Sequence, residues 1–575
     1  MSLSDQQKAI VGLPLDPLSV TACAGSGKTR TAVHRLAHMR RALNDDHGIV
    51  ALLSFSNVAV DTFRRDYEIL MRTSDPHRRS SAVEIDTVDG FITSNIIRPH
   101  AHRTLGCTRT PYLVEGSEPF LKGFTVFDGQ RPRPMTDLRV TIDGDQFRFH
   151  VEDDNRQTIA IAAAIALKAL AKLGQVGAYT HESGRYWTLQ TLKGQPFVLR
   201  AFARRYPHIL IDEAQDIGGM HQAVLELLVR AGSKLSLIGD PHQSIFDFAD
   251  ADGRFLANYG KRAGVAAQNL DINYRSVPAI LNVANNLSGR TDKAHRTAPD
   301  HLSGAYYIPY KNKQKQKALD TYGSMLEGAQ IDPALAVVLC RTAPSVKKWS
   351  GGEEAQGQGL VSILADAVIN RDKLGRMHEA YRLACKAIVR LLADKHGDLA
   401  YRLSRSILTP QDILIRRAIW GFVRDAETGL PSGHLLAKTE WHPVLVKRVK
   451  TFLKQLETAF ALAPAENLGN KLSKKKLKAT PLIQATDFGS AAGNAFRTST
   501  VHKVKGESIE AVMYVTSKEH VRAMLEGTGS ELGRIGYVAV TRARNLFVLA
   551  VPDNCLGEFE PLLKAKGFEK PGGST

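Results

Sequence analysis

The stretch Ala22–Thr29 (ACAGSGKT) has the residue types and spacing of a phosphate-binding loop. Gly25 and Gly27 let the backbone approach phosphate oxygens, Lys28 can reach the β- and γ-phosphates, and the Thr29 hydroxyl can ligate Mg²⁺. The general motif has glycine where this loop has its first alanine. A glycine-rich turn without a ligand is the alternative, but a loop between a strand and a helix favours phosphate binding.

A second stretch, His208–Asp216 (HILIDEAQD), is an apolar strand that ends in acids. Asp212 at the strand tip can hold Mg²⁺, and Glu213 beside it can orient or deprotonate a water molecule. An isolated Asp-Glu pair is usually solvated surface, but acids directly after a strand are less often so. Together with the phosphate loop, they indicate metal-assisted hydrolysis of a phosphoanhydride.

These motifs need a scaffold of strands that alternate with helices. Short apolar runs predict the strands, and helices are expected at 30–41 and after Asn57. This alternation is typical of α/β folds with parallel sheets and right-handed crossovers. The expected strands are 18–21, 49–53, 208–211, 235–238, 335–339, 511–515 and 546–550.

Two regions interrupt this alternation. Residues 98–202 predict an insertion with a hairpin near 138–151 and an alanine-rich helix at 158–173. Residues 344–495 predict a second insertion, which is mostly helical in period over 360–460. The pattern therefore predicts two α/β cores, each interrupted by an insertion.

The composition favours an anionic partner. The 575 residues include 76 Lys and Arg against 58 Asp and Glu, a net charge of +18. Nucleic acid is the first candidate and a membrane surface the second. Five scattered cysteines without a CxxC pair argue against a disulfide framework or a zinc ribbon and favour a reducing cytosol. The longest notable apolar run, 159–167, is too short for a transmembrane helix, and no secretory signal is expected.

The phosphate loop paired with DEAQD resembles the superfamily 1A helicases, of the UvrD, Rep and PcrA kind. Further segments resemble the other motifs of that family, in the family's order. They are Leu3–Gln7 (Q motif), Leu53–Asn57 (Ia), Thr87–Phe91 (Ib), Gly239–Phe246 (III), Asn273–Ser276 (IV), Thr500–Gly506 (V) and Tyr537–Ala543 (VI).

The resemblance implies a set of catalytic, nucleotide and metal contacts. Arg275 and Arg542 would reach the γ-phosphate across a cleft, and Gln243 would couple that phosphate to the nucleic-acid groove. Alone, either arginine would more often form a surface ion pair, and Gln243 would be an ordinary polar loop residue. The implied catalytic residues are Lys28, Glu213, Gln243, Arg275 and Arg542. The implied ATP contacts are Gln7, Ala22, Ala24, Gly25, Ser26, Gly27, Lys28, Thr29, Arg30, Tyr274 and Glu507, and the magnesium ligands are Thr29 and Asp212.

Among the ATP contacts, Gln7 would read adenine, and Arg30 and Tyr274 would sandwich it. Glu507 would contact the ribose, although it stands one place earlier than in the family motif. The implied DNA contacts are Phe55, Asn57, Thr87, Phe246, Phe248 and His502. Aromatic residues can stack on bases, each worth roughly 1–3 kcal/mol. Without the resemblance, core packing would be the more frequent role for such aromatics, and a structural role for such a histidine.

The resemblance also implies an architecture of two RecA-like domains, each with an inserted, largely helical subdomain. The expected segments are 1–97 (core 1A, first part), 98–202 (insertion 1B), 203–278 (core 1A, second part), 279–343 (core 2A, first part), 344–495 (a reduced 2B-like insertion) and 496–575 (core 2A, second part, and tail). The implied reaction is Mg²⁺-dependent ATP hydrolysis that drives movement on single-stranded DNA with 3′-to-5′ polarity. The rival interpretation is a DNA-sensing NTPase that regulates a partner nuclease without unwinding.

A closer resemblance lies in Thr87–Pro99 (TVDGFITSNIIRP). This stretch resembles the helicase-like subunit of the Gabija anti-phage system. The resemblance implies a cytoplasmic role in antiviral defence and a partner nuclease of the OLD family with a Toprim centre. No membrane association is expected.

Overall fold

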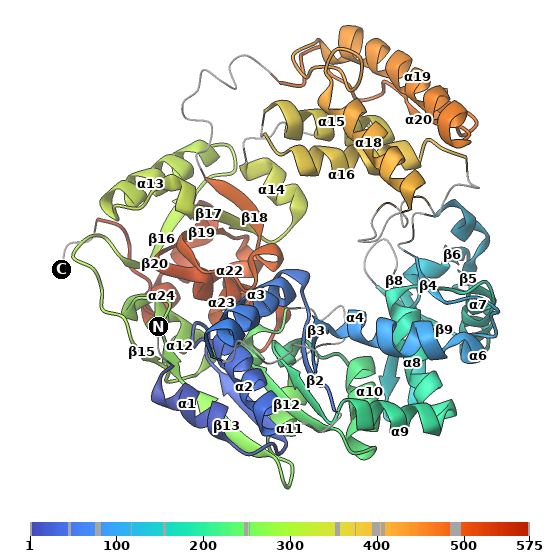
Figure 1. The fold of residues 1–575 in the computed structure, drawn as a ribbon. Helices are drawn as coiled ribbons and strands as arrows, with labels where there is room; N and C mark the ends of the chain where they lie inside the picture. The colour runs from blue at the N-terminus through green and yellow to red at the C-terminus, as the bar shows by residue number, and fades with distance from the viewer. Residues whose placement is uncertain are drawn as a thin grey trace. The chain divides into compact units, whose positions relative to one another are not determined.

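The computed structural model consists of two compact units. Unit 1 comprises Met1–Tyr112, Arg139–Ser350 and Ala495–Thr575, and unit 2 comprises Leu113–Leu138 and Gly351–Asn494 (Figure 1). The structure describes residues 3–43, 48–74, 82–114, 116, 118–152, 157–245, 251, 253–350, 357–373, 375–393, 399, 403, 409–483 and 496–572.

The first core of unit 1 is built on a six-stranded parallel sheet. Its strands are, in spatial order, β13 (Ala266–Leu270), β1 (Leu18–Ala22), β12 (Lys234–Gly239), β11 (His208–Ile211), β2 (Val50–Ser54) and β3 (Val83–Thr87). All residues of β2 and β11 are buried, as expected of parallel strands covered on both faces. The surrounding helices are α1 (Asp5–Gly12), α2 (Lys28–Ala42), α3 (Asn57–Ser74), α4 (Val88–Ile92), α10 (Gly219–Arg230) and α11 (Arg254–Tyr259).

Register in this sheet brings the two phosphate-site motifs together. Thr21 of β1 lies beside Gly239 of β12, and Ile211 of β11 lies beside Leu237 of the same strand. The carboxyl ends of the three strands therefore meet at one edge. This edge carries the phosphate loop, the acids after β11 and the turn after β12, which is where open α/β sheets bind ligands.

The second core of unit 1 contains a five-stranded parallel sheet. Its strands are β16 (Gly304–Tyr310), β20 (Ala543–Pro552), β19 (Ile509–Val515), β17 (Ala336–Cys340) and β18 (Arg497–Thr500). Its helices are α12 (Pro278–Ser288), α13 (Lys315–Gly328), α14 (Ala343–Trp349), α22 (Lys518–Glu526), α23 (Glu531–Arg542) and α24 (Leu556–Ala565). A short pair, β14 (Ile272–Asn273) and β15 (Lys293–Ala294), follows the last strand of the first sheet. The α/β class with parallel sheets is thus confirmed.

The first insertion carries a three-stranded antiparallel sheet as well as helices. The predicted hairpin is present as β7 (Arg139–Asp143) and β8 (Gln146–Glu152). The helix predicted at 158–173 is wrong at its start, because β9 (Thr158–Ile161) pairs with β8 and only α7 (Ala163–Gln175) is helical. The β-branched residues of β9 suit a pleated sheet better than a helix.

The remaining elements of this insertion and of the segments that flank it are strands and helices. They are the π-helix Thr93–Ile97, α5 (Arg98–His100), α6 (His102–Leu105), β4 (Tyr112–Leu113), β5 (Thr125–Phe127), β6 (Pro132–Pro134), β10 (Ala178–Tyr179), α8 (His181–Gly194) and α9 (Pro196–Arg205). Of these, β5 and β6 belong to unit 2.

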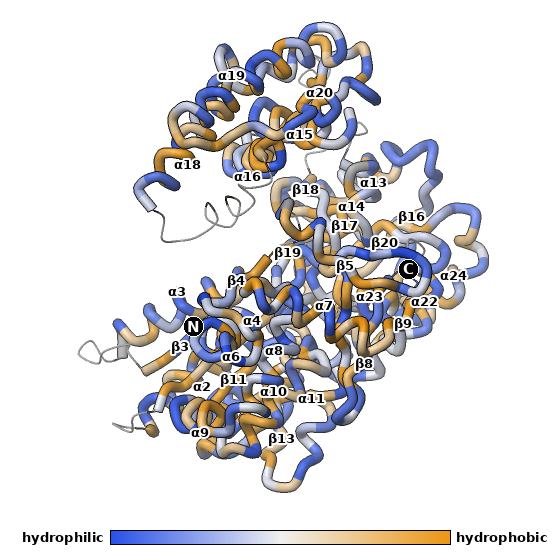
Figure 2. Tube along the Cα trace, turned by 90° about the vertical axis from the view of Figure 1, so that its right-hand side faces the viewer, coloured by the Kyte–Doolittle hydropathy of each residue, from blue (hydrophilic) through white to orange (hydrophobic). Residues whose placement is uncertain are grey.

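The rest of unit 2 is helical. Its helices are α15 (Gly359–Asp372), α16 (Met377–Val389), α18 (Pro410–Arg424), α19 (His442–Phe460) and α20 (Leu468–Lys471). Apolar and polar residues alternate along α18 and α19 (Figure 2), so each helix can bury one face. The buried faces share a hydrophobic core that includes Ile415, Trp441 and Leu453. None of the described helices in either unit is both long enough and apolar enough to cross a bilayer.

Candidate nucleotide and nucleic-acid site

The phosphate loop connects β1 to α2 and depends on two glycines. Gly25 and Gly27 have φ values of 72° and 80°, a region that favours glycine. A Cβ on Gly25 would lie 2.6 Å from the Arg275 Cβ, and a Cβ on Gly27 would lie 2.5 Å from the Gln7 Nε2. The loop therefore has room only for glycine at both positions, because other groups of the site pack directly against it.

Gln7 holds the phosphate loop from the first helix. Its Oε1 accepts a hydrogen bond from the Ser4 backbone N–H (3.0 Å), and its Nε2 donates to the Ser26 carbonyl (2.9 Å). Within the loop, the Ser26 hydroxyl donates to the Cys23 carbonyl (2.8 Å). Gln7, the residue predicted to contact adenine, therefore also positions the phosphate loop.

Of the two acids after β11, Asp212 is buried and Glu213 is half-buried, and both lie near Lys28. Burial and the neighbouring Glu213 charge raise the pKa of Asp212 above its ordinary value. Burial also disfavours the charged form of Glu213, but Lys28 and Lys505 outweigh it and lower the pKa of this carboxyl. Glu213 also has a left-handed backbone with φ 56°, a strained state that clusters at functional sites.

Asp212 and Thr29 fit a hard divalent cation. The Asp212 Oδ1 is buried and accepts no hydrogen bond from the described residues. An orphaned carboxylate oxygen of this kind is the ligand that Mg²⁺ prefers. Thr29 lies in the first turn of α2, directly after Lys28.

A chain of hydrogen bonds runs from Glu213 to Arg542. The Gln215 Nε2 donates to the Glu213 carboxylate, and the Gln215 Oε1 accepts from the Asp240 backbone N–H (3.0 Å). The Asp240 carboxylate accepts from the Gln243 Nε2 (2.7 Å), and the Gln243 Oε1 accepts from the Arg542 guanidinium (2.8 Å). The chain links Glu213 of the first core, the predicted water-activating acid, to Arg542 of the second.

Two arginines, the buried Arg542 and the half-buried Arg275, lie at the second-core end of this chain. Burial lowers the pKa of Arg542, and burial together with the Arg542 charge lowers the pKa of Arg275 to about 9. The Arg275 guanidinium donates to the Thr541 carbonyl (2.8 Å). Because Arg275, Arg542 and Lys28 all lie near Glu213, the site suits a multiply charged anion such as a triphosphate.

The segment Asn273–Ser276 joins the phosphate loop to the second core. The Asn273 Nδ2 donates to the Ala24 carbonyl (2.7 Å), and the Tyr274 N–H donates to the Gly25 carbonyl (2.9 Å). On the other side, the Ser276 hydroxyl donates to the Ala543 carbonyl (2.7 Å). The segment is therefore bonded to both cores at once.

The predicted adenine and ribose contacts have other neighbours in this structure. The Tyr274 ring packs against His295, with ring centroids 4.8 Å apart. The Glu507 carboxylate forms an ion pair with Arg497 (2.5 Å). The adenine sandwich with Arg30 and the ribose contact stay predictions.

Three of the predicted DNA contacts lie at or just after the ends of the neighbouring strands β2 and β3. Phe55 follows β2 and packs edge-on against His221, with centroids 5.6 Å apart. Asn57 is exposed at the start of α3, and the Thr87 hydroxyl caps α4 by accepting from the Gly90 N–H (2.9 Å). His502 of the second core contacts the Ile245 carbonyl (3.2 Å). Phe246 and Phe248 lie outside the described residues.

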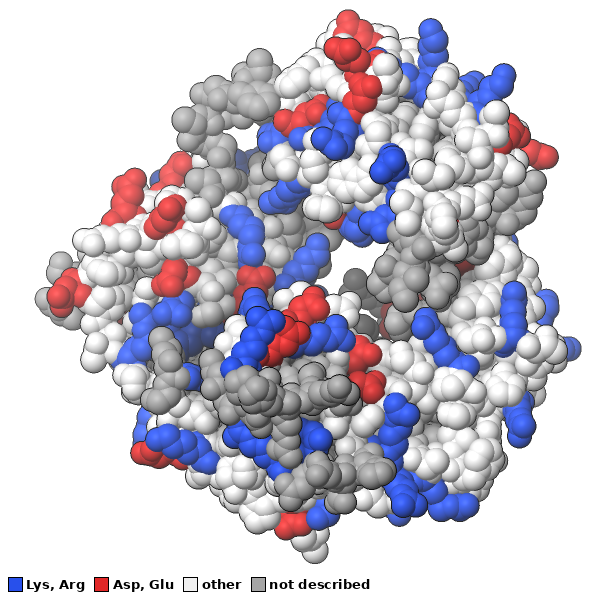
Figure 3. Space-filling model, in the orientation of Figure 1, with Lys and Arg blue, Asp and Glu red and all other residues white. Residues whose placement is uncertain are grey.

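Sequence reasoning missed Gln215, Asp240 and Lys505. All three stand inside the motifs quoted above, but their roles depend on contacts between segments far apart in the chain. The available signal was a polar residue soon after a buried strand, because Asp240 directly follows β12 and Gln215 stands four residues after the end of β11. Figure 3 shows Lys and Arg spread over the face drawn, so the net charge gave no pointer to these positions.

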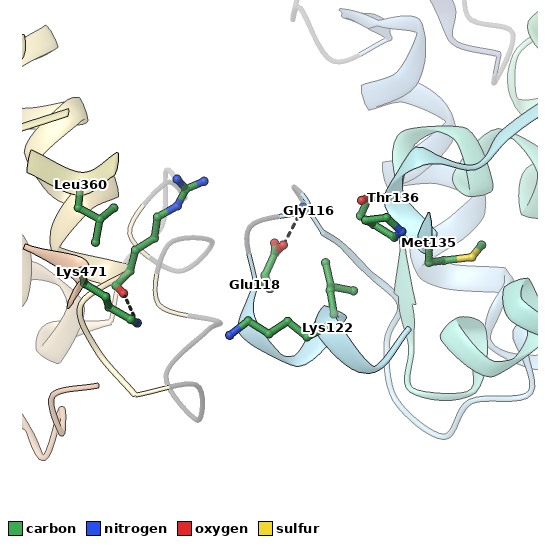
Figure 4. A pocket seen from close by; sticks show the side chains of 10 residues that line it. Gly116, Glu118, Lys122, Met135, Thr136, Leu360 and Lys471 are labelled. Atoms are coloured by element: carbon green, nitrogen blue, oxygen red, sulfur yellow. Dashed lines mark hydrogen bonds between the residues drawn. The ribbon is translucent and has the colours of Figure 1, made fainter. Parts of the chain in front are cut away.

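Unit 2 contains a separate cavity of about 490 Å³ (Figure 4). Lys122, Arg390 and Lys471 give it a basic lining, although the Lys471 ammonium donates to the Arg390 carbonyl (3.0 Å). None of the lining residues belongs to the motifs described above, so the cavity is not part of the nucleotide site.

Comparison with known proteins agrees with the motif order. Residues 3–263 match the UvrD/REP helicase N-terminal domain family. DNA helicase II of Escherichia coli (strain K12) is 27% identical over 316 residues, which cover 51% of this chain and 41% of that protein. ATP-dependent DNA helicase UvrD2 of Mycobacterium tuberculosis (strain ATCC 25618 / H37Rv) is 26% identical over 298 residues, covering 49% and 43%.

A third match extends further at lower identity. ATP-dependent DNA helicase UvrD1 of Mycobacterium bovis (strain ATCC BAA-935 / AF2122/97) is 22% identical over 650 residues, covering 94% of this chain and 81% of that protein. The chain thus spans less than half the length of the first two relatives. These similarities support the resemblance to superfamily 1A helicases.

Proposed function

We propose that this chain is a Mg²⁺-dependent ATPase that moves along single-stranded DNA and unwinds duplex DNA. The main support is the hydrogen-bond chain from Glu213 to Arg542, because it joins the proposed water-activating acid to an arginine of the other core. An arginine supplied across a cleft stabilises the charge of a phosphoryl-transfer transition state. The similarity to UvrD-type helicases supports DNA as the substrate.

In the proposed reaction, the phosphate loop and Lys28 bind the triphosphate. Thr29 and Asp212 would hold the Mg²⁺, which supplies charge neutralisation when bound. Glu213 orients the attacking water and accepts its proton. Gln243, Arg275 and Arg542 contact the γ-phosphate. Release of this phosphate removes the anion that the two arginines share.

Hydrolysis in this proposal alters the spacing of the two cores. Gln243 lies in the turn after β12, and Phe246 and Phe248 follow it in the chain. A shift of the second core would therefore move the residues that stack on bases, which produces stepping along the strand. The family resemblance supports 3′-to-5′ polarity.

Strand displacement measured together with ATP hydrolysis tests this function. The substrates are two duplexes of the same sequence, one with a 3′ single-stranded tail and one with a 5′ tail. We expect displacement of the 3′-tailed duplex only, with hydrolysis stimulated by both. DNA-stimulated hydrolysis without displacement of either duplex would favour the rival, a DNA-sensing NTPase that regulates a nuclease.

The stretch Thr87–Pro99 supports a more specific role in cytoplasmic anti-phage defence, as the helicase-like subunit of a Gabija-type system. The proposed partner is an OLD-family nuclease with a Toprim centre. Co-expression with such a nuclease, followed by size-exclusion chromatography, tests the pairing. Separate elution at micromolar concentration would count against it.

Phe55 provides a test of the DNA contacts. We expect Phe55→Ala to weaken binding of single-stranded DNA about tenfold, because base stacking is worth roughly 1–3 kcal/mol, and to leave basal hydrolysis unchanged. Fluorescence anisotropy with a labelled oligonucleotide measures the affinity. Phe197→Ala is the matched control, because Phe197 is 58% exposed on α9, outside the motifs. Equal affinities of the two variants would assign Phe55 to packing alone.

A further inference from the structure

A buried ion pair that the proposed hydrolysis does not use connects the two cores. The Lys505 ammonium contacts the Asp216 carboxylate, and the two side chains are 8% and 2% exposed. Asp216 ends the short helix after β11 in the first core, whereas Lys505 follows the short helix His502–Val504 of the second core. The pair therefore forms only when the two cores are docked.

The burial of this pair is hard to explain by stability. Desolvation of two charges offsets most of their attraction, and apolar residues of similar volume often serve as well. The Asp216 Oδ1 is also buried without a hydrogen bond from the described residues. Burial raises the pKa of Asp216 to about 6 even with Lys505 beside it. A costly, incompletely satisfied pair at this position is therefore more consistent with a role in the site.

The backbone after Lys505 leads directly to the arginine of the second core. Gly506 has φ 88°, so the chain turns sharply between Lys505 and Glu507. The Glu507 carbonyl then accepts a hydrogen bond from the Arg542 guanidinium (3.3 Å). Asp216 thus fixes Lys505, and the glycine turn places the carbonyl that orients Arg542.

These contacts complete a circuit around the predicted γ-phosphate position. One arm runs from Glu213 through Gln215, Asp240 and Gln243 to Arg542. The other returns from Arg542 through the Glu507 carbonyl and Lys505 to Asp216, three residues after Glu213. Both ends of the circuit therefore lie in the same segment after β11.

We propose that the Asp216–Lys505 pair positions Arg542 and so makes ATP hydrolysis conditional on docking of the second core. The inference rests on the proposed ATPase function and adds a positioning role for two residues. The pair lies in the acidic segment after β11 and not in the phosphate loop. It therefore affects turnover and leaves the affinity for ATP nearly unchanged.

Steady-state ATP hydrolysis of four variants tests this inference. We expect Lys505→Met and Asp216→Asn each to lower kcat about 30-fold with KM for ATP changed less than about threefold, the signature of an interaction made in the transition state. Lys505→Arg should recover kcat to within about fivefold of wild type, because it keeps the charge. The double variant should be no worse than either single, because the residues act as one unit.

The double variant also provides a test in case a single variant does not fold. Removing both charges avoids an unpaired buried charge, so it should fold even where a single variant does not, and its kcat then decides. Lys518→Met is the control, because Lys518 forms an exposed ion pair with Glu558 in the same core (2.7 Å, 54% and 44% exposed). It should hydrolyse ATP like wild type.

Two results would overturn this inference alone. One is a double variant with wild-type kcat, and the other is a double variant in which the effects of the single substitutions on kcat add. In either case wild-type hydrolysis would stand, and so would the proposed function. A wild-type chain without any ATP hydrolysis would instead overturn the proposed function and this inference with it.

Discussion

Lys28→Ala is expected to lower ATP turnover by about 10²–10³-fold or more, the loss typical of removing a single donor to developing charge. Lys28 begins α2 within the phosphate-loop motif and is buried next to the acids that follow β11. No other lysine of the loop can replace it. Steady-state hydrolysis with and without single-stranded DNA measures the loss, and both rates should fall together because the chemical step precedes any coupling to DNA.

The fold of this variant should remain intact. The loop is held by the Gln7 amide, the Ser26 hydroxyl and the Asn273 amide, which the substitution leaves in place. Thermal unfolding and circular dichroism check this point. A variant with a wild-type unfolding transition that still hydrolyses ATP at the wild-type rate would show that Lys28 does not contact the phosphates.

The sequence predicted the parts of this molecule whose signals are local. Apolar runs bounded by turn residues predicted strands in both sheets. The phosphate loop was recognisable from its glycines, which have the positive φ values that other residues tolerate poorly. The helix predicted at 158–173 failed at its start because Thr158–Ile161 is short, and alternation over four residues is easily read as the beginning of the following alanine-rich helix.

Contacts between distant segments were not predictable in the same way. Gln215 and Asp240 are 25 residues apart, and Asp216 and Lys505 are 289 apart. The sheet register brings the first two together, whereas docking of the two cores brings the second two together. A side chain's partner therefore follows from topology, while its chemical type follows from the sequence.

Gln7 illustrates the same limit on a shorter scale. The resemblance assigned it to adenine, but its amide also completes the cap of α1 and supports the phosphate loop. A single residue type can serve both roles, and only the contacts reveal the second. Substitution of Gln7 would consequently disturb the loop as well as any base contact.

Arg542→Ala is expected to have the largest effect on catalysis, a loss of about 10³–10⁵-fold in kcat, the range for arginines supplied across a cleft. Arg542 is buried at the end of α23, and its guanidinium donates to Gln243 and to the Glu507 carbonyl. Both contacts aim it at the segment after β11. Because the residue would act on charge that develops during reaction, KM for ATP should change by only a few-fold.

A lysine at this position separates geometry from charge. Arg542→Lys keeps a cation but loses the planar fork that lets one side chain contact Gln243 and Glu507 together. We expect it to recover little of the lost turnover. Arg522→Ala in the same core is the control, because Arg522 is exposed, forms an ion pair with Glu558 (53% and 44% exposed) and lies over the Phe559 ring, and exposed pairs contribute about 0–1 kcal/mol.

The position of Arg542 during turnover can be tested directly. A structure with a non-hydrolysable ATP analogue and Mg²⁺ should place the Arg542 guanidinium within hydrogen-bond distance of the γ-phosphate, with Gln243 released to the same group. Near wild-type turnover of a folded Arg542→Ala variant, or an Arg542 side chain still bonded to Gln243 and remote from the phosphate in the analogue complex, would contradict the proposed closure of the two cores over ATP. Either result would require the second core to act without touching the nucleotide, and the contacts from Gln243 and Glu507 to Arg542 would then serve docking alone.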